Sequence, residues 1–412
     1  MSRTNLKAFI FIPVLLVLSL YSYRAECAEF SIRPSIDLIQ EYNDNIFLSK
    51  GNQESDYITR IMPSVNMNYR TPFWDWRLDY TLNWWYYHKL GKNYDSHLIN
   101  LASHLNIINN FLYLDVNDNY SNIALDQRRP SNENNLNVNR TDTNNLTVSP
   151  YIKYKITPVD TLTAGYRYTN IWYREEEGIN RQMHTGYATI EHVFNPKFNA
   201  AIGVEYTADR PENTEPDNDQ TAVFVRGAYV ISERTNLDGT LRYIWIDFSN
   251  NNKEENISYN FGLVHRFHQM GEIQLRISSD ILTSALYGIH ESRTEQLTIR
   301  YGETFTVNGS VFHREDKYLE TDLKDKAIGI TTGFEYRPDP RLTFIISGTY
   351  EKNNYLPEDE DREIYRAFGE IAYQLTRKAN LILRDTYTKE NGRTGIEDYR
   401  NNIISIKVRI TI

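Results

Sequence analysis

The segment Trp74-Asp75-Trp76-Arg77-Leu78-Asp79-Tyr80-Thr81-Leu82-Asn83-Trp84 alternates a large apolar or aromatic side chain with a polar one. Successive side chains of a β-strand point to opposite faces, so this pattern predicts a strand with one apolar and one polar face. The same period of two recurs at 237–245, 257–267, 342–350 and 404–412. Beyond the N-terminal segment no stretch has the spacing of an amphipathic helix. The chain is therefore predicted to be all-β.

Short turn sequences separate these strands at regular intervals. Most are about 38 residues apart, and they are marked by Pro72, Asn110, Pro158, Pro196, Arg234, Gly271, Gly302, Pro340 and Lys378. Longer polar segments alternate with them at 121–142, 209–220, 313–325 and 351–362. This asymmetry is typical of bacterial outer-membrane barrels, whereas a β-sandwich gives no reason for it. The sequence predicts one antiparallel transmembrane β-barrel of about 20 strands (18–20), with short periplasmic turns and long extracellular loops.

The N-terminus has the composition of an export signal. Arg3 and Lys7 precede the apolar run 8–20, which is shorter than the ~20 residues that a membrane-spanning helix needs. Small residues follow at 25–28. Residues 1–28 are therefore predicted to be a cleaved signal peptide and residues 29–412 the barrel. Cleavage after Ala28 removes Cys27, the only cysteine; lipidation of Cys27 is the alternative, which the preceding Arg24-Ala25-Glu26 disfavours.

Composition agrees with a barrel that has a lipid-facing outside and a wet inside. The chain contains 31 Tyr, 17 Phe and 6 Trp, yet its mean hydropathy is −0.58. A disordered chain would be poor in aromatic residues. The last segment alternates to the C-terminus, as expected of a strand recognised by the outer-membrane insertion machinery. Its final residue is Ile412 rather than the Phe most often found there.

One short motif carries a family resemblance. Ile36-Asp37-Leu38 followed by Glu41-Tyr42-Asn43-Asp44-Asn45-Ile46-Phe47-Leu48-Ser49 resembles the start of outer-membrane β-barrel porins encoded with exopolysaccharide export and exosortase (PEP-CTERM) systems. The quoted residues number only twelve, while the architecture covers the whole mature chain. The resemblance implies an outer-membrane role in polysaccharide secretion and brings no catalytic residues with it.

Alternation also predicts which side chains line the lumen. The basic candidates are Arg77, Arg167, Arg226, Arg242, Arg266, Arg276, Arg300, Arg366, Arg384, Lys407 and Arg409, and the acidic ones are Asp79, Glu205, Asp238, Asp280, Glu335 and Glu370. The formal net charge is −9, so the negative excess is expected in the loops. A basic lumen favours anions. The hypothesis is an anion-biased pore for an acidic polysaccharide, with Arg242, Arg266, Arg276 and Arg300 forming one patch if their heights match. The alternative is that lumen arginines and acids pair across strands and fill the interior.

Other residues have less specific interpretations. Trp74, Trp76, Trp84, Trp85, Tyr86 and Tyr87 are expected in an interfacial aromatic girdle, with sugar stacking as the alternative. Asn43-Asp44-Asn45 carries oxygen ligands that calcium could use, but it lacks the EF-hand spacing, so a solvated loop start is favoured. No catalytic motif is present, and no enzyme activity, metal, cofactor or nucleic-acid partner is predicted.

The sequence thus predicts a porin-like passive pore in the outer membrane, with outer-membrane lipid, the insertion machinery and an acidic polysaccharide as partners. The first strand begins almost directly after the signal, so no N-terminal plug is expected. The alternative function is a non-conducting structural or adhesive barrel. The two functions differ in whether the lumen is open, which a loop such as 121–142 affects if it folds inward and which single-channel conductance measures.

Overall fold

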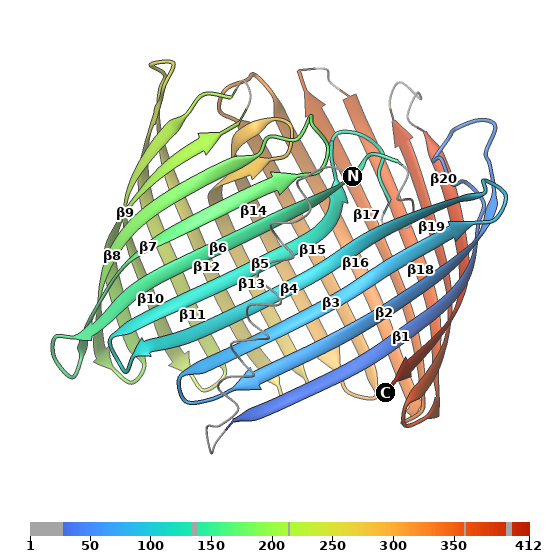
Figure 1. The fold of residues 1–412 in the computed structure, drawn as a ribbon, viewed down its shortest axis with the longest axis horizontal. Helices are drawn as coiled ribbons and strands as arrows, with labels where there is room; N and C mark the ends of the chain where they lie inside the picture. Colours follow the sequence, from blue (N-terminus) through green and yellow to red (C-terminus); the bar gives the residue numbers. More distant parts are fainter. Residues whose placement is uncertain (1–27, 133–134, 136–137, 213–214, 358–359, 393–397) are drawn as a thin grey trace.

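In the computed structural model the chain forms one closed barrel of antiparallel strands (Figure 1). The structure describes residues 28–132, 135, 138–212, 215–357, 360–392 and 398–412. Its twenty strands are β1 (Glu29–Asn43), β2 (Asp56–Arg70), β3 (Trp74–Tyr87), β4 (Lys92–Ile108), β5 (Leu112–Ala124), β6 (Arg140–Lys155), β7 (Asp160–Tyr173), β8 (Arg181–Asn195), β9 (Phe198–Pro211), β10 (Asn218–Ser232), β11 (Thr235–Phe248), β12 (Lys253–His268), β13 (Gly271–Ser284), β14 (Gly288–Gly302), β15 (Phe305–Tyr318), β16 (Lys324–Asp339), β17 (Leu342–Leu356), β18 (Glu360–Thr376), β19 (Ala379–Gly392) and β20 (Tyr399–Thr411).

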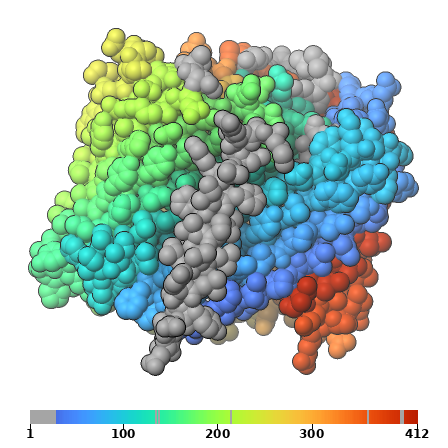
Figure 2. All heavy atoms as spheres, in the orientation of Figure 1, coloured from blue at the N-terminus to red at the C-terminus, as the bar shows by residue number. Residues whose placement is uncertain are grey.

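Each strand pairs with the next one along the chain, and the last strand pairs with the first. The closing ladder joins β1 to β20 from Ser35 opposite Thr411 to Asn43 opposite Ile403. Figure 2 shows the same closure from outside, where the red C-terminal strands lie beside the blue first hairpin. The predicted fold class and strand count are confirmed, and all nine predicted short turns join consecutive strands.

A short polar side chain sets most of the short turns. In the first of them the Thr71 hydroxyl accepts a hydrogen bond from the Trp74 amide at 2.9 Å. Equivalent bonds to a following backbone amide are made by Thr157, Asn195, Ser232, Asp339 and Thr376. Ser, Thr, Asn and Asp favour turns because they can bond the backbone locally in this way. The repeat seen in the sequence is therefore a repeat of self-contained turns.

The two faces of the wall differ as the alternation predicts. The outward face carries large apolar side chains that are open to the surroundings, with Ile202 and Ile346 each 63% exposed. Such exposure is costly in water and suits contact with lipid. The inward face carries polar and charged side chains, described below. No helix among the described residues is long and apolar enough to cross a membrane.

Part of the N-terminal prediction falls outside the described residues. Of the predicted signal peptide only Ala28 is described, and β1 begins at Glu29. The position of cleavage and the fate of Cys27 therefore stay predictions.

Candidate functional site

All the predicted basic lumen residues lie on the inward face of the wall. In β18, for example, Tyr365 and Ile371 are exposed on the outside, so Arg366 and Glu370 point inward and line an interior cavity. The six predicted acids alternate in the same way. Whether any of these side chains lines a conducting pore stays a prediction.

Half of the ten arginines have a carboxylate partner on the inward face. The bridges are Arg77 to Asp79 at 2.7 Å, Arg266 to Glu272 at 3.2 Å, Arg366 to Glu351 at 3.7 Å, Arg384 to Glu370 at 3.7 Å, and Arg409 to Asp37 at 2.7 Å. Arg167 and Arg242 instead lie over aromatic rings, those of Tyr187 and Phe224. Arg276 donates to Asn260, and Arg300 lies opposite Glu272. Arg226 shares the face of Phe224. Pairing with carboxylates, across strands in four of the five cases and within β3 for Arg77, thus takes up much of the positive charge, as the alternative weighed from the sequence supposes.

The four arginines expected to form one patch are separated by the strand register. They are Arg242, Arg266, Arg276 and Arg300. Arg242 is aligned with Ser258 of β12, whereas Arg276 is aligned with Gly262. Four residues along a strand correspond to roughly 13 Å. Arg300 lies a further step along, opposite Glu272. Arg242, Arg276 and Arg300 therefore form a staircase, and only Arg266 and Arg300 share a level, on either side of Glu272. The expected continuous patch is absent, because sequence alternation gives the face of a residue but not its height.

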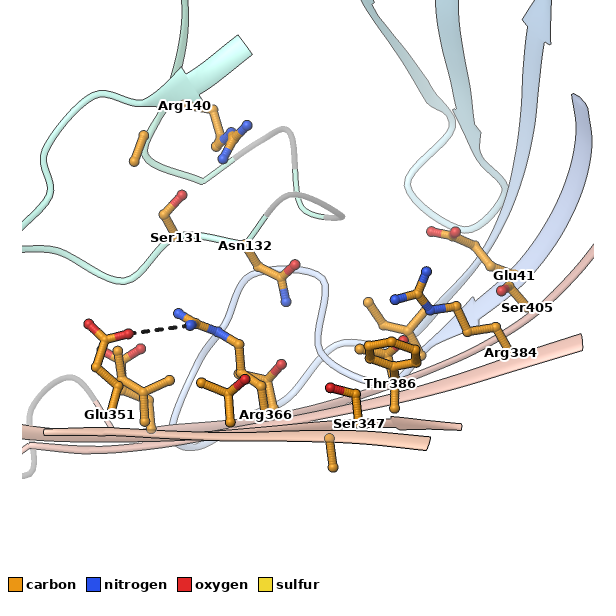
Figure 3. A pocket seen from close by; sticks show the side chains of 18 of the residues that line it. Glu41, Ser131, Asn132, Arg140, Ser347, Glu351, Arg366, Arg384, Thr386 and Ser405 are labelled. Atoms are coloured by element: carbon orange, nitrogen blue, oxygen red, sulfur yellow. Dashed lines mark ion pairs between the residues drawn. The ribbon is translucent and has the colours of Figure 1, made fainter. Parts of the chain in front are cut away.

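Positive charge collects instead in a cavity of about 810 Å³ against β17–β20, β1 and β2. We call it the basic chamber. Figure 3 shows Arg366, Arg384, Ser347 and Thr386 on the strands facing Ser131 and Asn132 of the loop that roofs them. Among the described lining residues, nine are basic and five acidic: Arg60, Arg129, Arg140, Arg314, Arg362, Arg366, Arg384, Lys407 and Arg409 against Asp37, Glu41, Glu351, Glu370 and Glu390.

Most chamber cations form an ion pair with a carboxylate, but Lys407 does not do so among the described residues. Arg60 pairs with Glu41 and Arg362 with Glu390, both at or near full burial. Lys407 is half-buried and makes no ion pair among the described residues. The carboxylates that interact with its charge, Asp37 and Glu370, are paired with Arg409 and Arg384. An ammonium group without an ion-pair partner of its own is suited to holding an anion that enters the chamber.

The roof of the chamber is the loop between β5 and β6, which crosses the lumen. We call its described residues, 125–132, 135, 138 and 139, the strap. Its Arg128 bonds the Asp325 carboxylate of β16 at 2.6 Å and the Leu356 carbonyl of β17 at 2.9 Å. Arg362 of β18 donates to the Arg128 carbonyl. The strap therefore reaches the wall opposite its own strands. The loop expected at 121–142 is shorter, because 121–124 belong to β5 and 140–142 to β6, and its described residues do fold inward.

A hub of buried asparagines holds the far end of the strap. Asn135 donates to the carbonyls of Asn45 and Ile46 at 3.1 and 2.8 Å. Asn401 of β20 donates to the Asn43 side chain at 2.6 Å and to the Asn45 carbonyl at 3.2 Å. Asn43, Asn45 and Asn135 are fully buried. The segment 43–45 is therefore not the solvated loop start that the sequence favoured; it joins the barrel seam to the strap.

A second element folds inward on the other side of the lumen. Ladder pairing between β12 and β13 starts only at Tyr259 opposite Ser279. Beyond that point the tip of the β13–β14 hairpin leaves β12, and Ile281 and Ile289 pack against Ile244 and Ile246 of β11. The Ile179 amide bonds the Ala285 carbonyl at 2.8 Å. This tip also meets the strap, because the Tyr287 hydroxyl donates to Asp126 at 3.0 Å.

Beside this tip lies a buried charge cluster. Arg181 is 1% exposed and bonds Asp209 at 2.5 Å and Glu215 at 2.6 Å. Glu320, in the loop after β15, lies near the same group. Burial and, secondarily, the charge of Glu215 raise the pKa of Glu320 to about 7. The cluster fixes the loops on this side by charge-assisted hydrogen bonds.

Two of the aromatic residues assigned to an outer girdle point inward. Trp85 and Tyr87 are fully buried in the barrel and pack with Ile46 and Ile58. The Arg60 guanidinium lies 3.8 Å from the centre of the Trp85 ring. The dense aromatic run 84–87 places neighbours on both faces of β3, so only Trp84 and Tyr86 share the outward face with Trp74 and Trp76.

Solved structures of outer-membrane receptors share the architecture of this chain. No family model and no curated protein matches the sequence. The ferric enterobactin receptor of Pseudomonas aeruginosa superposes with a TM-score of 0.52 at 10% sequence identity, over 93% of this chain and 80% of that chain. The FrpB iron transporter of Neisseria meningitidis in its apoprotein form gives a TM-score of 0.50 at 10% identity, over 92% and 81%.

This chain has an outer-membrane β-barrel fold. Identity this low shows the fold of the barrel and nothing of its cargo. Sequence reasoning identified the wall of this outer-membrane barrel but missed the hub and the inward hairpin tip. The clustered asparagines at 43–45 and 132–135 were a usable indication of the hub, because an Asn-rich loop start that is not solvated has to find partners inside.

Proposed function

We propose that this outer-membrane barrel is a constricted passive pore with a preference for anionic solutes. The observation that carries the proposal is the basic chamber, with its excess of cations over carboxylates and the unpaired Lys407. Cations around a confined aqueous space concentrate anions there. The long-loop end is narrowed by the strap, so the proposed pore is more selective than an open porin.

The chamber suits a carboxylate-bearing saccharide. Arg366 and Arg384 offer planar guanidinium groups that match a carboxylate. Hydroxyls of Ser347, Thr386 and Ser405 stand among them and provide neutral hydrogen-bonding partners for sugar hydroxyls. A place in exopolysaccharide export is part of the same proposal and is supported only by the resemblance of the motif at 41–49.

The test is ion selectivity of the refolded mature protein in a planar bilayer. The reversal potential across a salt gradient should show anion preference in the wild type. The triple variant Arg366→Gln, Arg384→Gln, Lys407→Gln should lose most of that preference. A matched control, Arg242→Gln, Arg276→Gln, Arg300→Gln, removes the same charge from the staircase and should lose less. A cation-selective wild-type pore would contradict the proposal.

A non-conducting scaffold or adhesive barrel is the second candidate. It is favoured by the strap and the hairpin tip, which meet inside the lumen through Tyr287 and Asp126. If the wild type inserts into the bilayer and shows no channel events, while a variant with a released strap does, the resting barrel is closed and the scaffold function gains support.

A further inference from the structure

The outward face of the long-loop rim carries positive charge along one sector. Six basic side chains alternate with outward-facing apolar or aromatic residues at the ends of β15–β20. They are Lys317, Lys324, Lys326, Lys352, Lys389 and Arg400. At this end of the wall the carboxylates that share the face among the described residues are Glu315, Asp361 and Glu363, and Asp385 lies on the same face nearer the middle of the wall. We call this sector the basic rim.

The basic rim lies directly beyond a tyrosine girdle. The ring centroids of Tyr350 and Tyr365, on neighbouring strands, lie 5.0 Å apart. Both hydroxyls donate to the Glu363 carboxylate, at 3.4 and 3.0 Å. Nearer the middle of the wall the same face carries exposed aliphatic residues such as Ile346 and Ile371. Apolar, then Tyr, then Lys is the order expected across the boundary between hydrocarbon and headgroups.

Several rim cations have little local compensation. Lys324 and Lys326 share the single carboxylate of Glu315, at 2.6 and 3.8 Å, and Lys352 pairs with Asp361 at 3.3 Å. Lys389 and Arg400 face each other in the β19–β20 ladder, and neither makes an ion pair within the described part of the chain. Two like charges held side by side gain most from a dianionic group that binds both.

The opposite sector of the rim has the reverse charge. On the outward face of β9–β12 the described carboxylates are Asp217, Asp219, Asp247 and Glu255, against Arg210 and Lys253. Both cations are already paired, Arg210 with Asp219 at 2.7 Å and Lys253 with Asp247 at 2.9 Å. The headgroup belt of the barrel is therefore basic over β15–β20 and acidic over β9–β12.

We propose that the basic rim binds a phosphorylated lipid headgroup of the membrane leaflet on the long-loop side, of the lipid A type. The phosphates lie between Lys326, Lys352 and Lys389, and the acyl chains cover the aliphatic face below the tyrosines. Lysine ammonium groups on flexible stems bind phosphate as point charges. The site is on the outside of the wall, so it is independent of whether the lumen conducts.

The experiment titrates lipid A into the folded barrel in a neutral detergent and measures bound lipid by native mass spectrometry. The variant Lys326→Gln, Lys352→Gln, Lys389→Gln should bind at least about tenfold more weakly, since each basic residue near an anionic surface contributes about fivefold. The control Lys197→Gln, Arg210→Gln, Lys253→Gln removes the same charge elsewhere and should bind within about twofold of wild type.

Two further arms identify the group that is recognised. Dephosphorylated lipid A should bind wild type as weakly as lipid A binds the rim variant. Inorganic phosphate should compete poorly, because it lacks the acyl chains. Equal losses in the rim and control variants, or undiminished binding of the dephosphorylated lipid, would overturn the proposal. Heat-dependent gel mobility shows that each variant is folded, and the double variant Lys326→Gln, Lys389→Gln provides a milder test.

Discussion

The two ends of the barrel are built in different ways. At the short-turn end each turn is closed by its own residues, as when the Asn195 side chain accepts from the Lys197 amide. At the long-loop end the bonds run between distant parts of the chain. Arg128 and Asp325 are 197 residues apart, and Asn135 and Asn45 are 90 apart. Local sequence therefore closes one end into hairpins, whereas tertiary contacts decide how far the other end is open.

Releasing the strap should have the largest effect, because it should open the long-loop end and leave the short-turn end unchanged. Arg128→Ala leaves the buried Asp325 carboxylate without its guanidinium, a loss of roughly 3–5 kcal/mol for a buried pair. The strap should detach from β16–β18, and single-channel conductance should rise. The hairpins at the short-turn end should be unaffected.

The matched control is Arg129→Ala on the same strap. The Arg129 side chain is 71% exposed, so its bridge to Asp126 contributes little. Conductance of this variant should stay near that of wild type. If both variants conduct as wild type does, the strap does not limit the pore.

A smaller effect, on stability alone, is expected from a substitution in a turn at the short-turn end. Gly302 has a φ of +119°, and a Cβ there would lie 1.8 Å from the Phe305 carbonyl oxygen. Gly302→Ala should therefore lower the free energy of unfolding by about 1–3 kcal/mol or more, as backbone strain of this kind does, without altering ion selectivity.

Gly309→Ala is the control for that substitution. It lies on the following strand, with nothing within 4 Å of an added Cβ. Urea titration of the two variants in detergent gives the comparison. Equal stabilities would mean that the turn adapts, and that this end is less self-contained than its geometry indicates.

The same contrast explains what the sequence could predict. Strand faces and turns follow from period two and from residues such as Thr71 and Thr157, because these effects act between near neighbours. The inward positions of Arg366 and Arg384 follow from alternation as well. The basic chamber does not, because the strap that gathers its charges is positioned by Asn45 and Asn401. The two faces of segment 84–87 were also confused, since an aromatic at every position hides the alternation.

The smallest expected effect is a pH dependence of stability caused by Glu320, in the loop after β15 at the long-loop end. The pKa of Glu320 is raised to about 7 by burial and by Glu215, whereas an unfolded Glu titrates near its ordinary value. The folded state then holds more protons in this window, so stability falls as pH rises from about 4.5 to 7.

Glu320→Gln removes this dependence. The variant should unfold at a higher temperature than wild type at pH 8 and at the same temperature at pH 5. Because Glu320 is only half-buried and solvent screens its charge, the gain should be below about 1 kcal/mol. A gain of the same size at both pH values would show that the charge of Glu320, facing Glu215 and Arg181, is not its source.

The asparagine hub also sets an order of events. Its members come from the first strand, the β5–β6 loop and the last strand, and Asn401 reaches Asn43 only when β20 lies against β1. The strap therefore gains its final hydrogen bonds only after the ring of strands has closed. The contacts that Asn401 contributes exist only in the completed barrel, so closure of the wall and fixing of this end of the strap are coupled.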